Sequence, residues 1–159
     1  MKKERRPKPV IGWREWVSLP DLGVEAIKAK VDTGARTSSL HAFEIRLVRR
    51  RGKEYVRFKI HPLQRSHRGV VEAEAEVADR RPVRSSTGHV QERVVIRTTL
   101  GIGEDSRPIE LTLTSRDAMG FRMLLGREAI RGRYTVDPGR SFRSAKKKIP
   151  TRAPRRGAK

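Results

Sequence analysis

Cysteine is absent from the 159 residues of the chain. Its absence excludes a disulfide framework, thiol catalysis and thiolate zinc sites, and it fits a reducing compartment. No run approaches the roughly 20 consecutive apolar residues that cross a bilayer, and no apolar segment follows the basic N-terminus as it would in a signal peptide. We therefore expect a cytoplasmic protein with no membrane contact and one core, because about 100–150 residues make one domain.

Aromatic residues make up only 5% of the chain, whereas basic residues are abundant and the net charge is +20. Residues 140–159 contribute +9 and residues 1–9 contribute +4, so that +7 remains for the residues between them. These ends cannot bury apolar surface to offset the entropy of ordering. We expect basic disordered tails at 1–9 and 140–159 around a domain at 10–139. The tails suit RNA or ribosome contact through phosphates, or a merely solubilising role.

Helical periodicity is scarce, and between the tails apolar residues recur at every second position. This period predicts strands with one buried face. The expected strands are 11–19, 27–31, 43–47, 56–60, 71–77, 94–96, 109–113, 123–126 and 134–136, with turns at 20–23, 51–52 and 101–103. The last of these strands is expected to end before residues 137–139. We expect one short helix at 127–131, and a polar loop at 80–89 that joins two strands as a mobile hairpin lid would.

The second expected strand ends at Asp32, which is followed by Thr33 and Gly34. Gly34 permits a sharp turn and lets its amide approach the carboxylate, while the Thr33 hydroxyl can hydrogen-bond across a subunit boundary. Two such loops face to face would bring two carboxylates together, and these would share one proton. The ionised carboxylate would draw a proton from water while the protonated one donates to the scissile carbonyl, hydrolysing a peptide without a covalent intermediate.

Asp32 could instead be an ordinary turn residue that hydrogen-bonds its own backbone. If it is catalytic, a second carboxylate is needed. Three other Asp-containing segments, at 21–23, 117–119 and 137–139, lack Thr or Ser at their middle position. The second carboxylate must then come from another chain, and we expect a homodimer in which Asp32 faces its own mate across a two-fold axis.

Four segments resemble the retropepsin-like aspartic peptidases, and in particular the small bacterial RimB-like family often labelled ATP-dependent zinc protease. They are GWREW at 12–16, KVDTGARTSSLHA at 30–42, VRSSTGH at 83–89 and MLLGRE at 123–128. The resemblance spans most of the chain between the tails. It implies an all-β, closed or partly closed retropepsin-like barrel with one short C-terminal helix, and an aspartic endopeptidase with its catalytic Asp-Thr-Gly at residues 32–34.

In such a fold the loop after Asp32 and the segment at 80–90 would enclose the substrate. The residues expected to contact it are Ala35, Arg36, Arg84, Ser85, Ser86, Gly88 and Arg127. Retroviral relatives carry an acidic residue at the place of Arg36, so any ion pair between subunits must be arranged differently here. Thr37, Ser38 and Ser39 are expected to line a polar loop, because no Gly-x-Ser-x-Gly elbow surrounds them.

The arginines beside this cleft favour acidic substrates, since unlike charges attract most where water is excluded. The resemblance adds that relatives are associated with ATP-grasp ligases that add glutamate tails to a ribosomal protein. Trimming or regulating such tails is therefore a plausible role for the peptidase. The competing interpretations are a non-catalytic RNA- or ribosome-binding module on the same barrel, and a zinc-dependent peptidase.

The zinc label is poorly supported by the residues themselves. His41, His61, His67 and His89 are scattered, and the chain has no His-Glu-x-x-His segment. We therefore expect no metal and no other cofactor, although a weak site that combines His61 and His67 with Asp32 or His41 stays open. A phosphate-binding loop ending in Gly-Lys-Ser/Thr is also absent, so nucleotide chemistry would belong to a partner.

Overall fold

The structure, a computed structural model, describes residues 7–63, 69–84, 87–115 and 120–144. Along these residues it contains eleven strands, one α-helix and one 3-10 turn. Their bounds are β1 Val10–Leu19, η1 Pro20–Leu22, β2 Val24–Val31, β3 Ser38–His41, β4 Phe43–Arg50, β5 Lys53–Ile60, β6 Val71–Glu76, β7 Asp79–Arg84, β8 Val90–Ile102, β9 Asp105–Thr114, β10 Met123–Leu125, α1 Arg127–Ile130 and β11 Thr135–Ser141. Among these elements, no helix has the length and apolar character needed to cross a bilayer.

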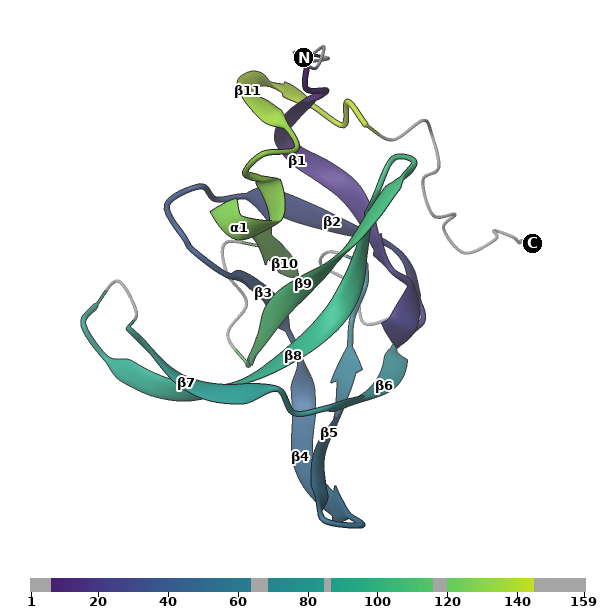
Figure 1. Ribbon diagram of the computed structural model, residues 1–159, viewed down its shortest axis with the longest axis vertical. Coiled ribbons are helices and arrows are strands. Elements are labelled where there is room, and N and C mark those ends of the chain that lie inside the picture. The colour runs from purple at the N-terminus through teal and green to yellow at the C-terminus, as the bar shows by residue number, and fades with distance from the viewer. Residues whose placement is uncertain (1–6, 64–68, 85–86, 116–119, 145–159) are drawn as a thin grey trace, which may run out of the picture.

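The larger sheet is partly closed into a barrel. Its eight strands follow the order β11-β1-β2-β10-β3-β9-β8-β7. An additional pairing between Ser18 of β1 and Gly101 of β8 joins two strands that are not neighbours in this order. A Cβ atom at Gly101 would lie 2.3 Å from the Ser18 hydroxyl oxygen, so a larger residue there would require the serine side chain to rotate. At the other end of the order, β7 and β8 continue away from the barrel as a projecting hairpin (Figure 1).

The smaller sheet consists of β4, β5 and β6. β4 and β5 form a hairpin whose end projects from the body of the molecule (Figure 1). Val56, Phe58 and Ile60 of β5 are buried and join this sheet to the hydrophobic core. Glutamates of β6 pair with basic side chains of β5 on the opposite face, which is therefore charged and exposed.

Alternation along the barrel strands directs apolar side chains inward. Ile27, Leu40, Leu111 and Leu125, from four different strands, are completely excluded from solvent. Burial of each such side chain contributes about 1.5–3 kcal/mol. This core fixes the ends of β2 and β10, and the loop that follows β2 is thereby fixed as well.

The expected all-β, partly closed barrel with one short helix near the C-terminal end is confirmed. Three local predictions are wrong. Residues 79–84 form β7 rather than part of a loop, and residues 38–41 form β3 rather than a loop lining. The segment 137–139 lies within β11, where the register with β1 shifts, so the last strand does not end at residue 136 as expected. β3 pairs with β9 and β10, which are distant in sequence, and β11 has an irregular register, so local periodicity reports neither strand. β7 pairs with its neighbour β8, but its many polar residues resemble a loop.

A buried carboxylate holds the C-terminal part of the described chain. Glu15 has no exposed surface, and its oxygens accept hydrogen bonds from the backbone amides of Gly12 at 2.6 Å, Arg143 at 2.8 Å and Ser144 at 3.0 Å. Ordered structure therefore continues past residue 139, where the sequence places the domain boundary. Glu15, the acidic residue of the GWREW segment, thus has a structural role. A buried carboxylate requires several donors, and these come from β1 and from residues 143–144.

Candidate active site

Asp32 lies where β2 ends, with its side chain half-buried. β2 runs parallel to β10, and the Asp32 amide donates to the Leu125 carbonyl at 2.8 Å, directly after the last register pair. The Gly34 amide donates to Asp32 Oδ1 at 3.1 Å, and the Ala35 amide donates to the Asp32 carbonyl at 3.1 Å. Thr33 and Gly34 are exposed at the outer end of this loop. The carboxylate is thus held by its own loop at a point that another molecule can reach.

This local turn is not unique to Asp32. Asp137 accepts a hydrogen bond from the Gly139 amide at 2.9 Å, which is the same contact two residues along the chain. Asp137 also forms a salt bridge with Arg140 at 3.3 Å. It lies in β11, a strand at the edge of the larger sheet. The hydrogen bond alone therefore does not identify a working carboxylate. The loop at 32–36 differs in that residues 126–128 pack against it and hydrogen-bond its carbonyls.

The segment that opens α1 supports the loop from behind. Arg127 N donates to the Ala35 carbonyl at 2.8 Å, and Glu128 N donates to the Arg36 carbonyl at 3.1 Å. The Arg127 guanidinium donates through Nη1 to the carbonyls of Thr33 and Gly34, both at 3.3 Å. Backbone and side chain of one short segment thus fix four consecutive carbonyls after Asp32. A loop held in this way keeps its carboxylate oriented without substrate.

Gly126 makes this approach possible. A Cβ atom there would lie 2.6 Å from the Thr37 carbonyl carbon and 2.8 Å from its oxygen, closer than real Cβ contacts. The Gly126 amide also donates to the hydroxyl of Ser38 at 3.0 Å, and Ser38 is buried. The two chain segments therefore pack backbone against backbone, which only glycine permits.

A groove of about 580 Å³ lies beside the loop and is walled by the β7–β8 hairpin. Its lining residues are Ala35, Arg36, Thr37, Ser39, Arg81, Pro82, Val83, Arg84, Arg93, Thr112 and Leu124. Four of these described lining residues are arginines and none is acidic. The groove therefore attracts anionic groups, and its size suits a few side chains of a peptide.

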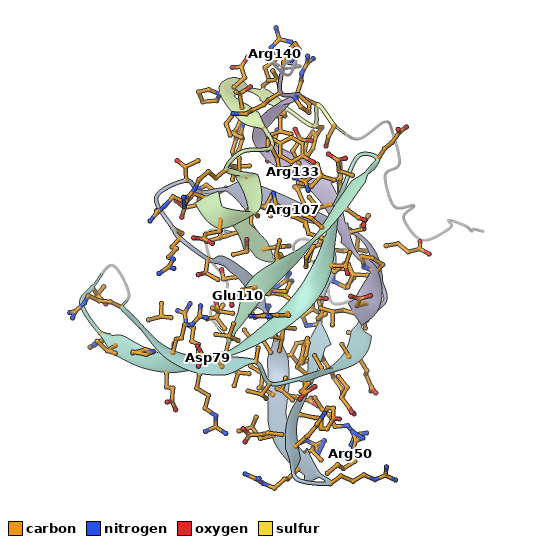
Figure 2. All side chains as sticks on the ribbon, viewed as in Figure 1. Arg50, Asp79, Arg107, Glu110, Arg133 and Arg140 are labelled. Atoms are coloured by element: carbon orange, nitrogen blue, oxygen red, sulfur yellow. The ribbon has the colours of Figure 1, made fainter. Side chains whose placement is uncertain are left out.

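Arg81 fixes the base of the β7–β8 hairpin. Its guanidinium pairs with Asp79 at 2.7 Å and with Glu110 of β9 at 2.8 Å, and Figure 2 shows these two acids near the start of the hairpin. The Arg81 hydrogen bond lowers the pKa of the Glu110 carboxyl, and the same guanidinium lowers the pKa of Asp79. Both acids in turn raise the pKa of Arg81. The charge of Arg81 is thus partly neutralised by acids of the same chain.

Of the residues predicted for the site, Ala35, Arg36 and Arg84 come together in the lining of the groove. Residues 32–36 form the loop beside it. Arg36 is largely exposed and pairs with Glu128 of its own chain at 3.4 Å. Gly88 lies at the exposed end of the hairpin with a φ of +90°. Ser85 and Ser86 lie outside the described residues.

Two aspects of the groove differ from the sequence-based expectation. Arg127 contacts the loop from behind, so direct contact with substrate stays a prediction for this side chain. Arg81 and Arg93 line the groove but were not among the residues expected to contact substrate, although Arg81 lies in the segment 80–90 that was expected to enclose it. In the sequence, these two arginines stand out only by alternating with other residues along β7 and β8. This alternation does not indicate which face of the hairpin lies toward the Asp32 loop.

A metal centre has little support among the described residues. No group of three or more His, Cys, Asp or Glu side chains comes together there. The rings of His41 and His61 stack at 6.5 Å, and His61 also stacks on Phe43 at 4.3 Å. His67 lies outside the described residues, and His89 lies on the β7–β8 hairpin. His41 and His61 are thus close to each other but belong to an aromatic cluster at the ends of β3 and β5.

Known proteins with similar sequences include much longer ones. A protein of Shewanella halifaxensis (strain HAW-EB4) named "Probable alpha-L-glutamate ligase" is 50% identical over 133 residues, which cover 84% of this chain and 29% of that protein. One of Parasynechococcus marenigrum (strain WH8102) with the same name is 54% identical over 131 residues, covering 82% of this chain and 28% of that protein. The chain thus spans less than a third of these relatives.

The fold and family are shown by two further comparisons. The crystal structure of protein Lpg0085, "with unknown function (DUF785)", from Legionella pneumophila subsp. pneumophila str. Philadelphia 1, superposes with a TM-score of 0.69 and 30% identity. It covers 86% of this chain and 98% of that chain. Residues 10–147 match the family model "RimB-like: Retropepsin-like aspartic endopeptidase RimB". The resemblance based on the four sequence segments is confirmed, and the chain belongs to the RimB-like family of retropepsin-like proteins.

Proposed function

We propose that this chain is one subunit of an aspartic endopeptidase, in which Asp32 pairs with Asp32 of a second copy across a two-fold axis. The observation that carries the proposal is the half-buried Asp32 carboxylate at a strand end, in a loop whose following carbonyls are fixed by residues 126–128. Such rigid support suits a catalytic group, because proton transfer requires the carboxylate to stay oriented.

Asp21 and Asp137, two candidates for the second carboxylate, already bind other residues of the chain. Asp21 accepts hydrogen bonds from the amide and hydroxyl of Thr99 at 3.2 and 2.8 Å, and Asp137 pairs with Arg140. Asp117 lies outside the described residues. These contacts favour a second copy of the chain as the source of the second carboxylate. A two-fold axis beside the exposed Thr33 and Gly34 would repeat the loop on both sides.

In the proposed dyad the two carboxyls share one proton, because two like charges at hydrogen-bonding distance do not both ionise. The ionised carboxylate removes a proton from a water molecule, which attacks the scissile carbonyl carbon. The protonated carboxyl donates its proton to the carbonyl oxygen, and a tetrahedral diol results. Collapse of the diol breaks the C–N bond and returns a proton to the leaving nitrogen.

Acidic substrates, including glutamate-tailed proteins, fit the charge of the groove. Arg36, Arg84 and Arg93 line it, and no acidic residue is among its described lining residues. The relatives named as glutamate ligases add independent support, because a peptidase domain within such a protein would meet the glutamate-rich product. A ribosomal protein bearing a glutamate tail is the substrate that the family resemblance suggests.

The test compares wild type, Asp32→Asn and Asp137→Asn on glutamate-rich peptides, with and without a chelator. Asp137→Asn is the matched control, because it preserves the same backbone contact in an Asp-x-Gly turn. We expect a loss of at least about 1,000-fold in kcat for Asp32→Asn, near-wild-type cleavage for Asp137→Asn, and no effect of the chelator. Unchanged cleavage by Asp32→Asn would discard the dyad, and loss of cleavage with chelator would select a metal-dependent peptidase.

A further inference from the structure

The β4–β5 hairpin ends in a turn whose residue type does not suit its backbone. Arg50 pairs with Lys53, so Arg51 and Gly52 form a two-residue connection, with φ of +50° and +80°. Both positions of such a turn require positive φ, for which Asn-Gly is strongly preferred. A side chain with a Cβ atom and no short polar group, such as arginine, is disfavoured at Arg51. The turn itself therefore does not explain why arginine is present.

Five other basic residues surround Arg51. We call the set the arginine hairpin, and its members are Arg46, Arg49, Arg50, Arg51, Lys53 and Arg57. All six are exposed. Arg46 lies directly opposite Arg57 in the register, an arrangement of like charges that destabilises a hairpin. Two features of the same hairpin thus reduce its stability while increasing its positive charge.

Part of this charge is balanced within the smaller sheet. Glu74 of β6 pairs with Arg50 and Arg57, and Glu76 pairs with Lys53 at 3.9 Å. Among the residues described, no salt bridge is formed by Arg46, Arg49 or Arg51. The outer strand and the turn are therefore the parts of the hairpin with the strongest positive potential.

The arginine hairpin lies away from the groove. In Figure 2 the label of Arg50 marks the end of the β4–β5 hairpin, at the opposite end of the molecule from Arg140, while Asp79 marks the base of the separate β7–β8 hairpin. A ligand held at this end would leave the groove open. The charge there calls for a partner other than the peptide bound beside Asp32.

We propose that the arginine hairpin binds the phosphate backbone of a nucleic acid duplex. Guanidinium groups present two parallel N–H donors that match phosphate oxygens of either RNA or DNA, and a two-stranded ribbon fits the major groove of B-form DNA, which is about 12 Å wide. Tyr55, the aromatic side chain beside the turn, is covered by the Arg50 guanidinium at 4.7 Å from the ring centroid. Because this ring is occupied, the hairpin has no stacking surface of the kind that holds unpaired bases. Duplexes are thus favoured over single strands.

The test measures the binding of full-length protein to fluorescent RNA and DNA duplexes across a salt series. The variant is Arg46→Gln/Arg49→Gln/Arg51→Asn, in which asparagine suits the positive φ of the turn and folding is preserved. The control, Arg131→Gln/Arg133→Gln/Arg140→Gln, removes the same number of charges beside α1 and β11. We expect the hairpin variant to bind at least about tenfold more weakly, with a slope of log K against log salt concentration smaller by up to about 2.7. The control is expected to lose less than about threefold, because Arg133 and Arg140 lie toward the opposite end of the molecule from the hairpin (Figure 2) and salt screens their charge over that separation.

Several results would overturn the proposal. They are no binding of either duplex by wild type, equal losses in the two triple variants, or tighter binding of a single strand than of a duplex. Displacement of the duplex by poly-L-glutamate at equal charge concentration would assign the hairpin to acidic proteins instead. Asp32→Asn is expected to bind the duplex as wild type does, so that failure of the peptidase proposal and failure of this one are distinguishable.

Discussion

At the scale of single residues, Asp32 and Asp137 have nearly the same backbone contact and very different surroundings. Each accepts a hydrogen bond from the glycine amide two residues later. The Asp32 loop also receives hydrogen bonds from the Arg127 guanidinium, and Gly126, whose amide donates to the Ser38 hydroxyl, packs against its far end. Whether an Asp-x-Gly turn is suited to catalysis therefore depends on the segments packed against it. The short motif alone does not distinguish these two aspartates.

Gly126→Ala is expected to destabilise the protein and displace the loop at 32–36. The new Cβ would meet the Thr37 carbonyl at 2.6 Å, and backbone atoms cannot yield as the end of a side chain can. Overpacking of this kind costs about 1–3 kcal/mol of unfolding free energy, which urea titration measures. Gly139→Ala is the control, since the nearest atom to its Cβ is Asp137 Oδ1 at 3.4 Å. Equal stability of the two variants would contradict the close approach at Gly126.

At the scale of secondary structure, strands with strong alternation were predictable and strands defined by distant partners were not. Ile27 and Val31 share the spacing of a half-buried strand, so the end of β2 at Asp32 follows from local sequence. β3 is four residues long and pairs with β9 and β10, so that its Ser38 and Ser39 read locally as loop. The groove was incompletely predicted for another reason, because the sequence of the β7–β8 hairpin does not show which of its side chains, such as Arg81 and Arg93, line the groove.

Arg81→Gln is expected to loosen the base of the β7–β8 hairpin. The Arg81 guanidinium lowers the pKa of Glu110 and of Asp79 from their ordinary values of 4.5 and 3.8, because it stabilises their ionised forms. The resulting stabilisation is present above these ordinary values and is lost as the pH falls through the lowered pKa values in the folded state. Near neutral pH we expect the variant to be slightly less stable than wild type, because solvent screens both pairs.

The stability difference between wild type and Arg81→Gln should therefore shrink as the pH is lowered from about 6 to about 3. Urea titrations of both proteins at several pH values measure it. Arg97→Gln is the control, since Arg97 also pairs with Glu110 but at 3.6 Å and with 73% of its side chain exposed. A difference for Arg81→Gln that does not change with pH would show that the guanidinium acts through packing rather than through its two carboxylates.

At the scale of the whole molecule, the positive charge falls into separate regions with different consequences. The groove arginines lie beside the Asp32 loop, the arginine hairpin lies at the end of the smaller sheet, and the last twenty residues carry nine basic residues. A net charge of +20 thus does not describe one surface. It permits an acidic peptide and a polyanion to be held at once, provided that the peptidase forms across a two-fold axis that leaves the arginine hairpins free.

Assembly of the proposed dyad has a quantitative signature in mixtures of wild type and Asp32→Asn. If both subunits supply one carboxylate, a mixed dimer has only one and is inactive. After subunits exchange freely in an equal mixture, about a quarter of the dimers retain two carboxylates, so activity per total dimer should fall to about a quarter of wild type. The measurement is cleavage of a glutamate-rich peptide after incubation at fixed total protein. Mixing with Asp137→Asn should leave the rate unchanged, whereas a rate of one half with Asp32→Asn would mean that each subunit works alone.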